Sequence, residues 1–431
     1  MTPARRIYAD YNATAPLRPE AKAAMTAALE LAGNPSSIHA EGRRARALVE
    51  GAREAVAAAI GACRDDIAFT SGGTEAVGSP LRGALGALGT GASFLASAIE
   101  HDAVASIADE HEKASAPARA IMSRWLDKPT DLSLLDSARD VVTGVSASPL
   151  STWPVLADGR VDLEFLRIIM AGHQKHAPAD APKPLVSLML VNNETGVIQP
   201  VAEAAEIVHA AGGLIHCDAI QALGKTVVSI IDLDVDYLSL SSHKIGGPQG
   251  VGAFYVKPGA PFRAVQTGGG QELGRRAGTE NVAGIAGFGA AADAAINGVA
   301  QYRALALHRD RMETRLKTVA PTLHVHGGAA PRVAGVSCFG VEGLASETQI
   351  MGLDLAGFAL SAGSACSSGK VKPSRVLTAM GLSDTAARSS VRASFGWNSA
   401  PSELEALAEA WIKMAARARP QLVNSNADAN A

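Results

Sequence analysis

The sequence predicts an α/β fold, with a large domain built on a mostly parallel sheet and a smaller second domain. Short β-branched runs alternate with alanine-rich helical runs up to about residue 278, which is typical of parallel strands joined by helices. From residue 281 onward a Gly/Ala-rich helix, a charged helix at 302–318 and a few strands follow. The length of 431 residues is sufficient for about two to three domains.

The composition excludes several classes of protein. A formal net charge of −3 and an isoelectric point near 6.4 give neither a basic surface for nucleic acid nor an acidic tail. The first residues reach Asp10 too early for a signal peptide. Glycines interrupt the uncharged run at 83–99, which therefore predicts a buried helix and strand and not a membrane span. The four cysteines have neither zinc-site nor disulfide-framework spacing. We therefore expect a soluble cytoplasmic protein.

Three segments differ in composition or apolar pattern from the predicted strands. Residues 41–61 have an apolar stripe with arginines opposite, which predicts an amphipathic helix that ends at Gly61. Residues 114–183 are richer in proline and polar residues and less regular, so we expect a surface insertion of unknown purpose. Residues 421–431 have no core-forming content and are expected to be disordered.

Two apolar runs end in polar residues that can reach one ligand. The run at 185–191 leads to Asn192, and the run at 214–218 stops on Asp218, with Gln221 three positions later. A carboxylate at this place can pair with a protonated pyridine nitrogen, and it can equally cap the following helix. Open α/β sheets bind ligands outside the carboxyl ends of their strands, so we expect these side chains at one edge.

A lysine and a small-residue turn add to this edge. Lys244 follows a short strand pattern and precedes a Gly-Gly-Pro turn. A lysine placed there can form a Schiff base with a carbonyl cofactor, and the flanking hydroxyls can bind a phosphate; an ordinary surface lysine is the alternative. Small residues at 71–74 precede a helix, and the backbone N–H groups of such a turn can hold an anion.

Together these motifs resemble those of the cysteine desulfurases, pyridoxal-phosphate enzymes of the class V aminotransferase group. They occur in the order typical of that family and cover nearly the whole chain. The matching stretches are 8–16, 33–37, 70–75, 100–101, 191–196, 216–221, 241–244, 268–272, 276–279, 363–367 and 389–392.

The resemblance implies an architecture and a domain division. The fold would be the type I fold of pyridoxal-phosphate transferases, with a mostly parallel seven-stranded sheet in the large domain and a smaller α+β domain. The large domain would span residues 18–280, including the insertion at 114–183. The small domain would combine residues 1–17 with 281–420 and carry the loop that contains Cys366.

The resemblance also implies a role for each matching residue. The implied catalytic residues are Lys244, Cys366 and His101. The implied binding residues for pyridoxal 5'-phosphate are Gly73, Thr74, His101, Asn192, Asp218, Gln221, Ser241, His243, Lys244 and Thr279. The implied substrate-binding residues are Asn34 and Arg392, the latter through the α-carboxylate. Thr279 would reach the phosphate of a neighbouring subunit, which implies a homodimer with shared active sites.

Cys366 determines the expected chemistry. It lies in a run of small residues at 361–369 that should form a mobile loop, close to Lys370 and Lys372. A thiol in such surroundings can be partly ionised and nucleophilic, whereas the other three cysteines lie in or beside apolar patterns and are expected to be buried and inert.

The implied reaction removes sulfur from L-cysteine, gives L-alanine and leaves a persulfide on Cys366. The sulfur would pass to an acceptor, such as an iron–sulfur scaffold protein on which Cys366 can share a cluster. No metal site of the chain's own is expected, because His216, Cys217 and Asp218 are adjacent on a strand and cannot converge on one ion.

Two alternatives stay open, and one motif departs from the family pattern. A selenocysteine lyase or aminotransferase of the same fold would keep Lys244 but not depend on Cys366. A sulfur-carrier or scaffold protein that has lost turnover is the other alternative. The departure lies at 76–80, where asparagines are replaced and Pro80 is expected to shorten or kink the helix beside the phosphate site.

Overall fold

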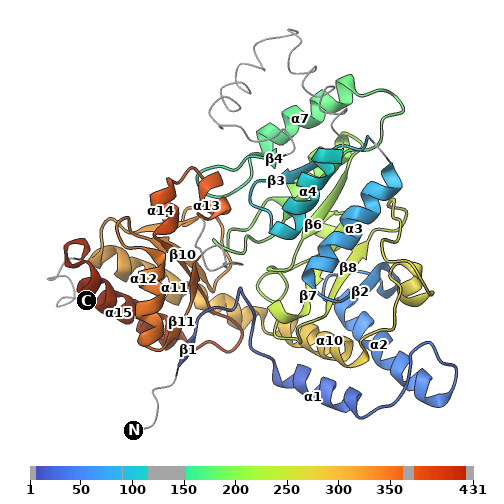
Figure 1. The fold of residues 1–431 in the computed structure, drawn as a ribbon, viewed down its shortest axis with the longest axis horizontal. Coiled ribbons are helices and arrows are strands. Elements are labelled where there is room, and N and C mark those ends of the chain that lie inside the picture. Colours follow the sequence, from blue (N-terminus) through green and yellow to red (C-terminus); the bar gives the residue numbers. More distant parts are fainter. Residues whose placement is uncertain (1–5, 90, 115–151, 363–372, 424–431) are drawn as a thin grey trace.

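The computed structural model describes residues 6–89, 91–114, 152–362 and 373–423. Cys366, the predicted tail from residue 424 onward and most of the predicted insertion lie outside the described residues. The tail predicted at 421–431 begins too early, because Leu422 lies in a 3-10 turn and packs against the core. The chain forms two domains that lie side by side (Figure 1), and the termini of the described part are both on the smaller one.

The large domain is built on a seven-stranded sheet with strand order β2-β8-β7-β6-β5-β3-β4. Only β8 runs antiparallel to its neighbours, so the predicted mostly parallel sheet is confirmed. The strands are β2 (Ile67–Thr70), β3 (Phe94–Ser97), β4 (Thr152–Trp153), β5 (Leu185–Met189), β6 (Leu214–Asp218), β7 (Tyr237–Ser241) and β8 (Gly252–Val256).

Helices cover both faces of this sheet because alternate strand residues point to opposite sides. Ala68 packs into a core with α3 and α4, whereas Ile67 and Phe69 pack on the opposite side with α2, α8 and α10. The helices of this domain are α1 (Pro19–Leu29), α2 (Ala40–Ala58), α3 (Gly73–Leu88), α4 (Asp102–Ala114), α7 (Leu163–His176), α8 (Val201–Ala210), α9 (Ile230–Leu233) and α10 (Val282–Asn297), with the 3-10 turns η1 (Arg64–Asp66), η2 (Ser242–Lys244) and η3 (Gln271–Gly274).

The small domain holds an antiparallel sheet of four strands with order β12-β13-β10-β9. A short parallel pair, β1 with β11, joins the N-terminal segment to it. Its strands are β1 (Ile7–Tyr8), β9 (His324–His326), β10 (Val336–Gly340), β11 (Phe358–Ala359), β12 (Ser361–Ala362) and β13 (Ser390–Ser394). Its helices are α11 (Val299–Val319), α12 (Ser346–Leu355), α13 (Arg375–Ala379), α14 (Asp384–Arg388) and α15 (Pro401–Ala418), followed by η4 (Pro420–Leu422).

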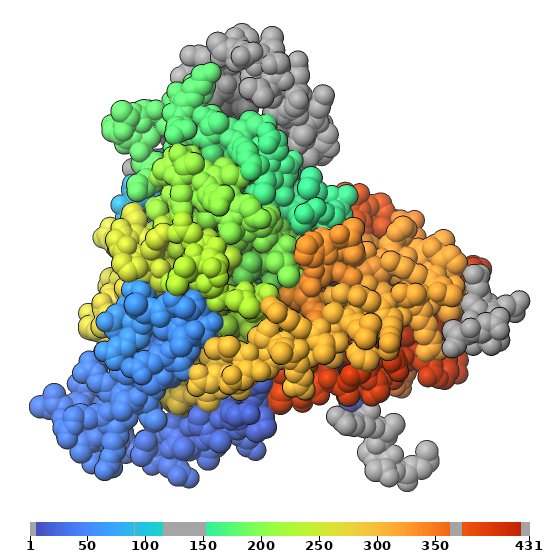
Figure 2. Space-filling view, turned by 180° about the vertical axis from the view of Figure 1, so that it is seen from behind, coloured from blue at the N-terminus to red at the C-terminus, as the bar shows by residue number. Residues whose placement is uncertain are grey.

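The connection between the domains differs from the predicted division at residue 281. That division places α10 in the small domain, but α10 packs against α1 and α2 of the large domain. The Cβ atom of an alanine at position 289 would lie 2.6 Å from the Cα atom of Ala52 on α2, so the two helices are in close contact. From behind, α10 and α11 pass in yellow and orange from the large to the small domain (Figure 2).

The predicted insertion at 114–183 is too wide. β4 pairs with β3 as the edge strand of the large sheet, and Trp153 is fully buried. Phe165 and Leu166 on α7 are also buried. Apolar burial thus makes the second half of this segment part of the domain, although its proline and polar content resembles that of a surface insertion.

Two further expectations concern cysteines and membrane segments. Cys217 and Cys338 are buried as expected, but Cys63 is exposed, because it lies in the turn after α2 and not on its apolar face. No single helix in the described ranges is long and apolar enough to cross a bilayer, and only the bent pair of α10 and α11 meets that criterion jointly.

A buried ion pair fixes the loop at 265–280 to the large sheet. Both guanidinium nitrogens of Arg53 reach the Glu272 carboxylate, at 2.5 and 3.1 Å, and the Phe69 backbone N–H donates to it at 2.8 Å. Both side chains of the pair are almost fully buried. Removing the carboxylate would leave the buried Arg53 charge with only the more distant Glu50 carboxylate, at 3.4 Å, and would leave the buried Phe69 N–H group without its acceptor.

We expect Glu272→Ala to lower the free energy of unfolding of the large domain by about 3–5 kcal/mol. Glu54→Ala is the matched control, since it removes the exposed partner of Arg64 and should cost less than about 1 kcal/mol. Denaturant unfolding of both variants measures the two effects. Equal losses of unfolding free energy in the two variants would contradict a stabilising role of the buried pair of Arg53 and Glu272.

Candidate active site

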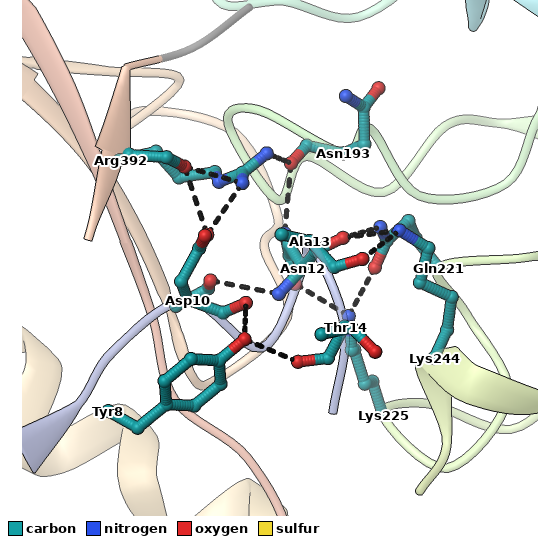
Figure 3. Close-up of polar contacts among 12 residues, drawn as sticks. Tyr8, Asp10, Asn12, Ala13, Thr14, Asn193, Gln221, Lys225, Lys244 and Arg392 are labelled. Atoms are coloured by element: carbon teal, nitrogen blue, oxygen red, sulfur yellow. Dashed lines mark hydrogen bonds and ion pairs between the residues drawn. The ribbon is translucent and has the colours of Figure 1, made fainter. Parts of the chain in front are cut away.

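The polar residues singled out in the sequence converge where the carboxyl ends of the large sheet face the small domain. The segment 8–14, which follows β1, lies between the two domains and contacts residues of both (Figure 3). Asp218 ends β6, Lys244 ends the turn after β7, and Arg392 lies in β13. The structure therefore brings these three predicted residues to one place.

Lys244 is largely buried and points at backbone carbonyl groups. Its Nζ donates to the carbonyl oxygens of Asn12 at 2.6 Å and Ala13 at 2.9 Å. Burial and, after it, the nearby positive charge of Arg392 lower the pKa of Lys244 to about 8, whereas Asp10 and Asp218 oppose the shift. An amine with this pKa can exchange its proton near neutral pH.

Asp218 is almost fully buried, and its Oδ1 accepts a hydrogen bond from the backbone of Ile220 at 2.9 Å. Burial raises its pKa, and the hydrogen bond, His101 and Lys244 oppose this shift. Burial and the negative charge of Asp218 also raise the pKa of Glu100 to about 8. A carboxylate held here suits a cationic partner, such as a protonated ring nitrogen.

An anion cradle lies at the start of α3. Gly73 is the first helical residue, no side chain caps this helix, and Ser241 lies beside it. The Ser241 hydroxyl is buried without a hydrogen-bond partner within the described ranges. A side chain on Gly73 would approach that hydroxyl to 3.2 Å. Free helix N–H groups and an unpaired hydroxyl fit a phosphate group, as predicted for Gly73, Thr74 and Ser241.

Arg392 is buried, and its guanidinium group is only partly satisfied. Nη2 donates to Asp10 Oδ1 at 2.8 Å and to Ser361 Oγ at 2.7 Å, and Nη1 donates to the Asn193 carbonyl at 3.1 Å. Nε is buried without a partner in the part of the chain that the structure describes. The guanidinium group thus has a donor left for a substrate carboxylate, beside a carboxylate of the protein itself.

Asn192 and Gln221, the predicted partners of the cofactor's ring oxygen, have contacts within the protein. The Asn192 side-chain oxygen accepts from the backbone N–H groups of Glu194 and Thr195 and from the Thr195 hydroxyl, so it shapes the turn after β5. Gln221 donates to the Asn12 carbonyl at 2.9 Å. Both residues therefore lie at the site and also support its backbone.

The remaining predicted residues are His101, His243, Asn34 and Thr279. His101 is exposed and accepts from the Ala103 backbone at the start of α4, at 3.1 Å. His243 contacts Thr14 Oγ1 at 3.1 Å, and burial lowers its pKa to about 4. Asn34 and Thr279 are exposed on loops of the large domain. The Asn34 side chain accepts from the Ser36 backbone at 2.9 Å.

Both ends of the segment that carries Cys366 are fixed at the site. Ser361, just before residues 363–372, donates to Asp10 Oδ1 at 2.9 Å. Ser374, just after them, donates to the buried Glu194 carboxylate at 2.5 Å. Cys366 itself is outside the described residues, but its segment begins and ends beside Arg392 and the turn after Asn192.

Sequence reasoning missed Asn12, Asp10 and Lys225 as site residues. Lys225 Nζ is buried and donates to Asn12 Oδ1 at 2.7 Å and Gln221 Oε1 at 2.5 Å. Burial lowers its pKa well below the usual range, and the positive charges of Lys244 and Arg392 add to this. Lys225 lies in a non-helical turn after β6, so no periodic pattern in the sequence indicated its role.

Comparisons with known proteins agree with this geometry. The Aminotransferase class-V model matches residues 7–123 and 151–407. A cysteine desulfurase of Cereibacter sphaeroides is 39% identical over 94% of both chains. One of Enterobacter agglomerans is 36% identical over 96% of this chain and 94% of its own. The crystal structure of a NifS-like protein from Rickettsia africae superposes with a TM-score of 0.76 at 27% identity, over 95% of this chain and 99% of its own. The chain belongs to the class V aminotransferase family.

Proposed function

We propose that this protein is a pyridoxal-phosphate-dependent cysteine desulfurase that converts L-cysteine to L-alanine and keeps the sulfur as a persulfide on Cys366. The observation that carries this proposal is the convergence of Lys244, Asp218, the cradle at Gly73 and Arg392 in a chain whose curated relatives are cysteine desulfurases.

Each part of the site fits one part of pyridoxal phosphate. The cofactor, when bound, would supply a carbonyl group and a ring that takes up electrons from the substrate's α-carbon. Lys244 would hold the carbonyl carbon, Asp218 the ring nitrogen, and Gly73 and Ser241 the phosphate. His101, His243, Thr74, Asn192 and Gln221 would complete the site, and Thr279 would serve the phosphate of a second subunit.

Arg392 would bind the α-carboxylate of L-cysteine. Its unpaired Nε and the neighbouring Nη2 form one edge of the guanidinium group, which matches the two oxygens of a carboxylate. Asp10 and Ser361 already share Nη2. Substrate binding would therefore share or replace these contacts, in the region where the segment with Cys366 begins.

Lys244 would move the proton at the substrate's α-carbon, since its pKa of about 8 allows both forms near neutral pH. The Cys366 thiol then takes the sulfur. The substrate's C–S bond breaks, an S–S bond forms to Cys366, and the α-amino acid keeps a C–H bond in place of the C–S bond. L-cysteine and a thiol thus become L-alanine and a persulfide, without an external oxidant.

The partners follow from this chemistry. The persulfide would pass to a sulfur acceptor, with an iron–sulfur scaffold protein as the expected class. A homodimer with shared sites and a cytoplasmic location complete the proposal. Exposed Thr279 is consistent with a role in a second subunit's site.

Replacing Cys366 tests the proposed acceptor of sulfur. We expect Cys366→Ala to lose both alanine and persulfide formation in a single turnover with L-cysteine, while the absorbance of the bound cofactor is kept. Cys63→Ala is the matched control, because Cys63 is an exposed thiol outside the site and should leave both products unchanged. Alanine formation that survives Cys366→Ala would instead indicate a lyase or an aminotransferase.

The pKa of Lys244 predicts how fast the cofactor is taken up at each pH. Only the neutral amine reacts with a carbonyl group, and its fraction rises about tenfold per pH unit below the pKa. With a pKa of about 8, uptake by the cofactor-free protein should rise between pH 6 and pH 8 and then level off. A rate that continues to rise up to about pH 10, as for an ordinary lysine, would contradict this environment.

Arg392→Lys tests the carboxylate contact. Lysine keeps the charge but loses the planar fork. We expect kcat/KM for L-cysteine to fall on the order of 100-fold, mainly through KM, because the lost charge-assisted hydrogen bond contributes about 1.5–3 kcal/mol. Cofactor absorbance should be unchanged. Steady-state kinetics measures the effect, and an unchanged KM would remove Arg392 from the substrate site.

A further inference from the structure

Pro80 lies inside α3, the helix whose first turn forms the anion cradle. Proline has no backbone N–H group, so it cannot donate to the carbonyl four residues earlier, and its ring displaces that carbonyl from the helix. The carbonyl concerned is that of Ala76, which is fully buried. The helix nevertheless runs through Pro80 to Leu88, so the predicted shortening does not occur.

Ser239 on β7 supplies the missing donor. Its hydroxyl donates to the Ala76 carbonyl oxygen at 2.8 Å. A hydroxyl has one hydrogen, so the contact between Ser239 Oγ and His216 Nε2, also 2.8 Å, must have the imidazole as donor. His216 Nδ1 then accepts from Ser187 Oγ at 2.9 Å.

This chain of hydrogen bonds crosses neighbouring strands of the sheet and is wholly buried. Ser187, His216 and Ser239 are each 0% exposed and lie on β5, β6 and β7. Burial lowers the pKa of His216 to about 3. The ring thus stays neutral at physiological pH, and the hydrogen bonds keep the same direction there.

The chain of hydrogen bonds ends beside the anion cradle. Ser239 and Ser241 point to the same face of β7, since side chains alternate along a strand. Ser241 lies beside Gly73, and Ser239 contacts Ala76 one turn further along the helix. The first turn of α3 therefore lies over the strand, with Ser241 beside its start and Ser239 bonded to its end.

We propose that Ser239, oriented by His216, is a positioning residue for the cofactor's phosphate: it bonds the carbonyl that Pro80 leaves without a helical donor and thereby holds the first turn of α3 over Ser241. The inference rests on the proposed function only in naming the phosphate as that of pyridoxal phosphate. The coupling between Ser239 and Pro80 is a property of the protein alone.

A double-mutant cycle tests the proposal, with the affinity for pyridoxal phosphate and the thermal midpoint of the full-length protein as readouts. Ser239→Ala should weaken cofactor binding about tenfold or more, because it leaves buried polar groups unpaired. Pro80→Ala restores an N–H group that can donate to Ala76. In that background, Ser239→Ala should cost less than about threefold, and its loss of thermal midpoint should shrink in parallel.

Ser337→Ala is the matched control, since it removes a buried hydroxyl that donates to Glu313 in the small domain. It should leave cofactor affinity unchanged in both backgrounds. The proposal is overturned if Ser239→Ala has equal effects in the wild-type and Pro80→Ala backgrounds. It is also overturned if neither Ser239→Ala nor the double variant folds. Folding of Ser239→Ala only together with Pro80→Ala would support it. If no variant or wild type binds the cofactor, the proposed function fails, but the thermal cycle still decides the coupling.

Discussion

The site depends on the hydrogen bonds that the backbone and side chain of Asn12 make with both domains. Its carbonyl accepts from Gln221 and Lys244, its side-chain oxygen accepts from Lys225, and its side-chain nitrogen donates to the Asn193 carbonyl, all in the large domain. Its backbone N–H donates to Ser394 Oγ of the small domain at 2.9 Å. Asn12 is only 2% exposed, so each of these bonds is shielded from water and costly to break. Because one short segment bonds to both domains, the position of the small domain and the direction of the Lys244 amine are set together.

This arrangement concentrates positive charge inside the protein. The positive charges of Lys244 and Arg392 lower the pKa of Lys225, and that of Arg392 lowers the pKa of Lys244. Within the described ranges, only Arg392 of these three residues has a carboxylate ion-pair partner, Asp10. Desolvated like charges are unfavourable unless anions or neutralisation compensate them. A phosphate and a substrate carboxylate would supply that compensation, so the electrostatics of the site favour the ligands that the proposed function requires.

The sequence predicted the parts of the fold that depend on local pattern. The strands β5 and β6 are buried along their whole length, and the apolar runs in their sequences indicated this. The roles of Asn12 and Lys225 depend on contacts between residues more than 200 positions apart, which no local pattern encodes. The predicted bounds of the insertion were wrong for a related reason, because composition does not reveal that Trp153 lies in the edge strand of a sheet.

The Ser241 hydroxyl and Nε of Arg392 are buried at this site and have no hydrogen-bond partner among the described residues. Each such atom costs about 1–3 kcal/mol when it stays unpaired. The elements that carry them are otherwise tightly packed, since β7 and β13 are fully buried. Loose packing therefore does not explain why these atoms lack partners. They are the donors that a phosphate and a carboxylate would use, and the site gives up part of the protein's stability to keep these donors available for binding.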